Sequence, residues 1–170
     1  MGTLCFMQDI DFLKDKAYPL MKGTAQFCLI CLVDDGKGRL ITSPSTSPEN
    51  LFITPDAYKG STMYGGTADL SMIRECLQQT ISASETLGVD VEFRIKTQQT
   101  LAKLYPYQIG KKGNLQEWYY DWEDLKPQHR YQSHLFGLYP GHQINPEKPP
   151  ELAKACRKSL EIKGNQATVR

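Results

Sequence analysis

The sequence lacks the features that mark several large classes of protein. No apolar run is long enough to span a bilayer, and no basic segment followed by an apolar stretch marks a secretory signal at the start. Neither charge sign dominates, because 20 lysines and arginines face 19 aspartates and glutamates, leaving a net charge of +1. This balance gives no electrostatic reason to expect nucleic acid or an anionic membrane as a partner.

Cysteine and histidine are few and are poorly spaced for a disulfide framework or a metal site. The five cysteines are an odd number in a chain of 170 residues. Cys28 and Cys31 form a CxxC, but they lie in the apolar run FCLICLV without a second pair, so we expect buried thiols. His129, His134 and His142 do not place two imidazoles on one helical face. No phosphate-binding glycine loop and no GxSxG elbow occurs, which argues against nucleotide and serine-hydrolase chemistry.

The patterns that are present predict a soluble and mainly helical domain. Helical spacing covers residues 9–34 with a break at Pro19, then 68–87, 91–104 and 151–161, with a short helix near 133–138. In the second helix we expect Thr67 as N-cap and Gly88 as the stop. One apolar stripe of that helix is expected to face the core: Leu70, Ile73, Leu77 and Ile81. We find little convincing strand.

A long loop over residues 105–132 is the first candidate for a functional segment, since loops of this length inside compact domains are usually functional. It mixes aromatic and acidic side chains: Glu117, Trp118, Tyr119, Tyr120, Asp121, Trp122, Glu123 and Asp124. Aromatic faces beside planar polar groups suit a sugar ring. The alternative is that the two tryptophans anchor the core while the acids remain solvated.

The second candidate is TSPSTSPEN, residues 42–50, which presents one carboxylate, Glu49, and one amide, Asn50. Pro44 and Pro48 exclude helix and favour stiff, extended backbone. The apolar residues on both sides place the segment inside the fold rather than in a linker. Such a loop can hold an acid still, although a single carboxylate does not define a catalytic site.

Four segments in this order resemble glycoside hydrolase family 95: TSPSTSPEN, YPYQIGKKGNLQEWYYDWED, HRYQSHLFGLYPG and ELAKACRKSLEIKGN. The resemblance covers about residues 11–165. It implies an (α/α)₆ barrel, a ring of six helical hairpins, of which this chain is a fragment with long connecting loops. It also implies an inverting α-L-fucosidase that cleaves terminal, typically α-1,2-linked fucose, some members preferring α-L-galactose, without metal or other cofactor. The expected partner is a fucosylated glycan or oligosaccharide.

The resemblance assigns roles to six residues. The SPEN glutamate is the general acid, which falls on Glu49, and we expect burial to keep it protonated near neutral pH. The HRHxSHL motif supplies sugar contacts, which fall on Arg130 and His134. Tyr131 stands where the family usually has a second histidine, so this chain lacks one imidazole. Glu117 and Trp118 match the QEW motif as expected walls of the substrate pocket.

The resemblance also indicates what residues 1–170 do not supply. The family activates its water with an asparagine and an aspartate, which we place before and after this chain, and Val169-Arg170 departs from the family pattern. We therefore expect residues 1–170 to be a catalytic-domain fragment that is inactive alone. The alternatives are a non-catalytic sugar-binding remnant and a helical interaction fragment that self-associates through exposed helix faces. Family members are often periplasmic or secreted, but the localisation of this chain stays open.

Overall fold

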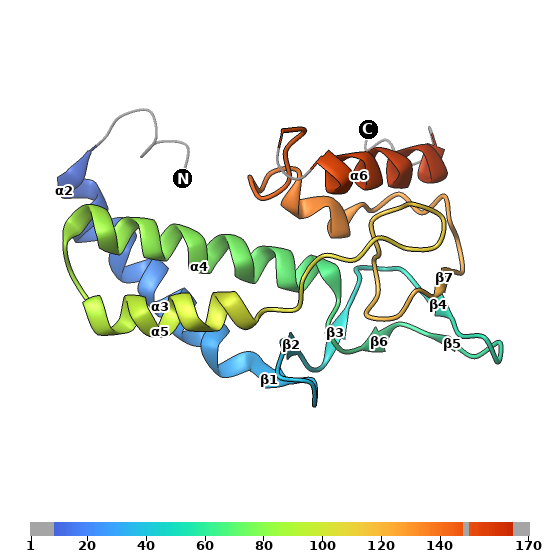
Figure 1. The fold of residues 1–170 in the computed structure, drawn as a ribbon, viewed down its shortest axis with the longest axis horizontal. Helices are drawn as coiled ribbons and strands as arrows, with labels where there is room; N and C mark the ends of the chain where they lie inside the picture. The colour runs from blue at the N-terminus through green and yellow to red at the C-terminus, as the bar shows by residue number, and fades with distance from the viewer. Residues whose placement is uncertain (1–8, 148–149, 165–170) are drawn as a thin grey trace.

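The computed structural model describes residues 9–147 and 150–164, and these are mainly helical (Figure 1). The helices are α2 (Ile10–Phe12), the π-helical η1 (Leu13–Ala17), α3 (Tyr18–Cys31), α4 (Thr67–Leu87), α5 (Val91–Lys103), the 3₁₀ helix η2 (Ser133–Gly137) and α6 (Pro150–Lys163). None of these helices is both long and apolar enough to cross a bilayer. The mainly helical prediction is therefore confirmed for the described residues.

The first helical segment differs from the prediction at two points. Pro19 does not break it, because α2, η1 and α3 follow one another without a gap. The Tyr18 N–H bonds to the Leu13 carbonyl, five residues back, and this wider π-type turn directly precedes the proline, which lacks an N–H. The helix also ends at Cys31 rather than near residue 34, because residues 32–34 are extended as strand β1.

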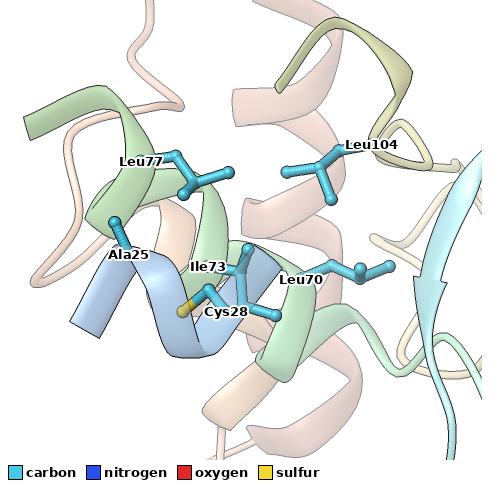
Figure 2. Packing of buried hydrophobic residues seen from close by; sticks show 6 residues of the cluster. All are labelled: Ala25, Cys28, Leu70, Ile73, Leu77 and Leu104. Carbon is cyan, nitrogen blue, oxygen red and sulfur yellow. The ribbon is translucent and has the colours of Figure 1, made fainter. Parts of the chain in front are cut away.

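Helix α3 packs against α4, and α4 forms a hairpin with α5 (Figure 1). The main apolar cluster lies between these three helices and the start of the following loop, and Figure 2 shows its members: Ala25, Cys28, Leu70, Ile73, Leu77 and Leu104. The predicted stripe of α4 is buried, Gly88 ends the helix in the left-handed region, and Cys28 is a buried thiol as expected. Cys31 is only partly buried.

Helix α4 begins differently from the prediction. Gly66, not Thr67, is the N-cap, and the Thr67 hydroxyl instead donates to the Gln116 carbonyl at 2.6 Å. The Thr67 N–H donates to the Glu117 carbonyl at 3.1 Å. A side chain at Gly66 would meet the Ser45 hydroxyl at 2.5 Å, which explains the glycine. The start of α4 is thus bonded to the segment that carries Glu117.

Short strands, which the sequence did not predict, form small sheets, and the β4–β7 pairing in one of them joins the two candidate segments. They are β1 (Leu32–Asp34), β2 (Leu40–Thr42), β3 (Ser45–Thr46), β4 (Phe52–Ile53), β5 (Lys59–Gly60), β6 (Thr62–Met63) and β7 (Glu123–Asp124). β1 pairs with β2, β3 pairs with β6, and β4 lies between β5 and β7, all antiparallel. Because Phe52 pairs with Asp124, the long loop lies directly beside the end of TSPSTSPEN.

Helix α6, near the C-terminal end of the chain, packs over the long loop and η2 (Figure 1). It begins and ends within two residues of the prediction, while Pro149, expected to open it, lies outside the described residues. Its buried face joins a second apolar cluster: Leu115, Leu135, Ile144, Ala155 and Cys156. The last turn of α6 therefore lies close to the segment around Glu117.

Candidate active site

Glu49 lies in a tight turn between β3 and β4. The Asn50 N–H donates to the Ser47 carbonyl at 3.1 Å and closes the turn. Glu49 has a φ of 53°, in the left-handed region that residues other than glycine rarely adopt. The Ser45 hydroxyl donates to Asp69 Oδ2 at 2.6 Å and ties the preceding strand to α4. The side chain of Glu49 is 58% exposed.

Three of the six predicted site residues meet at the surface. Arg130 Nη2 donates to Glu49 Oε2 at 2.8 Å, and the Tyr131 hydroxyl lies 3.4 Å from Glu49 Oε1. The Arg130 guanidinium also lies over the Tyr131 ring, 4.8 Å from its centre. Two motifs that are 81 residues apart thus combine an exposed carboxylate with a cation and a phenol. We call Glu49, Arg130 and Tyr131 the surface triad.

The expectation that burial keeps Glu49 protonated is wrong for this structure. The hydrogen bond and positive charge of Arg130 outweigh the small desolvation and hold the pKa of the Glu49 carboxyl below its ordinary value. Glu49 is therefore ionised at neutral pH. A general acid needs its proton, so this geometry is that of a carboxylate paired with arginine rather than one ready to donate.

The other three predicted residues, Glu117, Trp118 and His134, lie in the interior. Their exposed fractions are 6%, 2% and 2%, and all three border a small cavity that includes no residue of the surface triad. The Trp118 ring packs edge-on against Phe52, and its Nε1 donates to Asp124 Oδ1 at 2.8 Å. Trp118 thus anchors the core, as in the alternative interpretation of this loop. That alternative is wrong for Glu117 and Asp124, which are not solvated.

Glu117 is the centre of a buried polar cluster. Its Oε1 accepts hydrogen bonds from Ser47 Oγ at 2.5 Å and Asn50 Nδ2 at 2.9 Å. Its Oε2 lies 3.4 Å from Lys163 Nζ and 3.2 Å from His134 Nδ1. Burial alone raises the pKa of Glu117, but its electrostatic interactions with His134 and Lys163, together with these two hydrogen bonds, outweigh the effect of burial. The net pKa is lowered, and Glu117 is ionised.

The pKa values of two further groups of the cluster are shifted in opposite directions. Burial lowers the pKa of His134 to about 4, so the imidazole is neutral at physiological pH and Lys163 supplies the positive charge. Burial, with the negative charge of Glu117, raises the pKa of Asp124 to about 6. Lys163 Nζ lies 3.7 Å from Asp124 Oδ2, so it faces both carboxylates. The cluster therefore holds one permanent cation between two acids of unequal strength.

These shifts predict an altered pH dependence of stability for Asp124→Asn. Between pH 6 and 4 the folded chain binds the Asp124 proton that the unfolded chain releases, so Asp124 adds stability as pH falls. His134 does the opposite below pH 6.5, because only the unfolded chain takes up its proton. Asp124→Asn should therefore lower the free energy of unfolding by roughly 3 kcal/mol more at pH 4 than at pH 7, because the Asp124 pKa is shifted by about two units.

Urea unfolding at pH 7, 6, 5 and 4 measures this difference. The exposed Asp11→Asn serves as the matched control, and its curve should run parallel to that of the parent chain. A curve for Asp124→Asn that is also parallel to the parent contradicts the prediction.

Sequence reasoning missed Lys163, although a signal for it exists. Lys163 follows Cys156 and Ser159 at helical spacing, and those two positions form the buried face of α6. A lysine on an apolar or small-residue face indicates a buried ion pair. Within the described residues, no group of three or more histidine, cysteine, aspartate or glutamate side chains could hold a metal ion.

Comparison with known proteins identifies the family. The model of the glycosyl hydrolase family 95 catalytic domain matches residues 2–169. Alpha-L-fucosidase 2 of Arabidopsis thaliana is 44% identical over 162 residues, which are 95% of this chain and 19% of that protein. Probable alpha-fucosidase A of Aspergillus niger is 32% identical over 146 residues, 82% of this chain and 18% of that protein. The chain thus spans about a fifth of the length of these relatives, and it belongs to glycosyl hydrolase family 95.

Proposed function

We propose that this chain is part of an inverting α-L-fucosidase that hydrolyses terminal α-1,2-linked fucose, with Glu49 as the general acid. The family and the names of both relatives support fucosidase chemistry. The observation that carries the assignment is the surface triad, in which the SPEN glutamate meets the arginine and tyrosine of the HRYQSHL segment. Glu49 and Arg130 are exposed and Tyr131 is half-buried, so the three can reach a sugar, while Glu117, Trp118 and His134 are buried.

The ionised state of Glu49 in this structure fits the role only if substrate changes its surroundings. Arg130 offers several N–H donors that can turn from the carboxylate to sugar hydroxyls. A bound sugar also removes water from the carboxyl, and both changes raise its pKa towards that of a working acid. Arg130 and Tyr131 thus bind fucose in this proposal, and binding restores the proton that Glu49 must donate.

Residues 1–170 supply one side of this reaction. The described partners of Glu49 are a cation and a phenol, and neither can act as the base that an inverting glycosidase needs on the opposite face of the sugar. We propose that the helices are part of an (α/α)₆ ring and that other segments of the whole catalytic domain carry the asparagine and aspartate that activate water. The chain alone then binds sugar weakly and does not turn it over.

A chimera tests this proposal. Residues of this chain replace the matching 162 residues of Arabidopsis Alpha-L-fucosidase 2, and hydrolysis of an aryl α-L-fucoside is measured. We expect the folded chimera to hydrolyse the fucoside and the purified 170-residue chain to show no turnover. Turnover by the chain alone contradicts the proposal that the water-activating residues lie in other segments. A folded but inactive chimera contradicts the fucosidase assignment. Fucosyl and α-L-galactosyl substrates with different linkages then define the specificity.

One observation favours a second candidate, a self-associating helical fragment. Leu20, Phe27 and Ile30 on α3 are 74%, 65% and 81% exposed, which is unusual for large apolar side chains. Sedimentation of the 170-residue chain over a range of concentrations measures this association. A chain that stays monomeric throughout argues against it.

A further inference from the structure

The turn that carries Glu49 is fixed from beneath by a single carboxylate oxygen. Ser47 and Asn50, which flank the Pro48–Glu49 pair, both donate to Glu117 Oε1, at 2.5 and 2.9 Å. Ser47, Asn50 and Glu117 are 2%, 2% and 6% exposed, so water does not compete for these bonds. We call this set, residues 47, 50 and 117, the carboxylate clamp.

The backbone of Glu49 needs such support. Its φ of 53° lies in the left-handed region, which is unfavourable for a residue with a Cβ. Backbone strain of this kind persists only where surrounding contacts fix the conformation. The clamp holds the residues on both sides of the strained position, and the Asn50 N–H bond to the Ser47 carbonyl closes the turn between them. Without the clamp, the turn can relax and carry the Glu49 carboxyl away from its place.

The clamp is itself held by helix α6. Glu117 uses Oε1 for the turn, and its Oε2 faces the Lys163 ammonium at 3.4 Å. Lys163 is 3% exposed and is the last residue of α6, so the ion pair links the far end of the described chain to the turn. His134 Nδ1 also lies 3.2 Å from Oε2. Both oxygens of the Glu117 carboxylate thus face groups of the chain itself.

We propose that Glu117 is a positioning residue for Glu49, acting through Ser47 and Asn50 and held in place by Lys163. This inference rests on the proposed function, in which Glu49 protonates the leaving group. A general acid must lie within hydrogen-bond reach of the glycosidic oxygen, and a displacement of about 1 Å can cost about 100-fold in rate. In this proposal Glu117 does not contact the sugar as a wall residue but supports the turn that carries Glu49.

The test uses the chimera and removes one clamp donor at a time. Ser47→Ala and Asn50→Ala should each lower kcat by about 10- to 100-fold, while KM changes by no more than about 3-fold, because sugar binding by Arg130 and Tyr131 is retained. Thr46→Ala is the matched control. Its hydroxyl donates mainly to the Ser61 carbonyl at 2.8 Å, has only a long 3.5 Å contact with the Ser47 carbonyl and none with Glu117, so we expect its kcat to stay within about 2-fold of the parent.

Asn50→Asp separates positioning from a general loss of structure. The new carboxyl keeps the acceptor for the Leu51 N–H, but at neutral pH its charge opposes that of Glu117. When protonated it can donate to Glu117 as the amide does. The kcat of this variant relative to the parent chimera should therefore rise as pH falls from 7 to 5. A ratio that does not change with pH contradicts the clamp.

Outcomes for the clamp and for the proposed function are distinct. Folded Ser47→Ala and Asn50→Ala chimeras with parental kcat overturn the positioning role even if Glu49 proves to be the acid. Full activity after loss of Glu49 overturns the proposed function instead. If the variant chimeras do not fold, a glutamate-specific protease applied to the 170-residue chain measures release of the turn. Cleavage after Glu49 should then be faster in Ser47→Ala than in Thr46→Ala, and equal rates overturn the proposal.

Discussion

Glu49→Gln in the chimera should lower kcat by about 10²- to 10⁴-fold on a substrate with a poor leaving group, the range that one general acid contributes. Glutamine has nearly the same shape and can still accept a hydrogen bond from Arg130, but it has no proton to donate to the departing oxygen. KM should change little, since the sugar contacts of Arg130 and Tyr131 remain. Steady-state kinetics on a fucosyl-galactose substrate give both constants.

The leaving group identifies the cause of this loss. An aryl fucoside with an acidic phenol needs little protonation, so Glu49→Gln should slow it far less than it slows the fucosyl-galactose substrate. Glu92→Gln, at an exposed position in the first turn of α5, is the matched control and should leave both rates unchanged. Equal losses on the two substrates show that Glu49 acts in another way, and the absence of any loss removes it from the mechanism.

The helices were the part of the fold that the sequence predicted best. In α4 the stripe from Leu70 to Ile81 and the stop at Gly88 follow from spacing and backbone preference, which are local properties. The Thr67 cap was wrong because a tertiary bond to the Gln116 carbonyl takes its hydroxyl. The Pro19 break was wrong because the π-type turn before it accommodates the proline, and no local rule predicts that turn.

The candidate site could be predicted only in part. Motif resemblance selected Glu49 and Arg130, and the structure brings them within 2.8 Å of each other. It could not separate exposed from buried members, because that depends on the β4–β7 pairing and on where α6 ends. The two strands of this pairing are two residues long, too short to leave a periodic pattern.

Lys163→Met should destabilise the 170-residue chain by about 3–5 kcal/mol, the range found when one partner of a buried ion pair is removed. Methionine keeps most of the apolar stem but leaves two buried carboxylates, Glu117 and the mostly ionised Asp124, without their cation at pH 7. Urea unfolding at pH 7 measures the change. Lys158→Met on the same helix is the matched control, since this lysine is 47% exposed, 3.7 Å from Glu161, and should contribute less than about 1 kcal/mol.

A double variant decides whether the loss comes from uncompensated charge. Glu117→Gln together with Lys163→Met removes both charges of the pair and leaves an amide that can still accept from Ser47 and Asn50. If buried negative charge is the cause, this double variant should recover more than half of the stability lost in Lys163→Met alone. If the stability losses of the two single variants simply add in the double variant, the lysine stem stabilises α6 by packing. The ion pair is then not what couples that helix to the Glu49 turn.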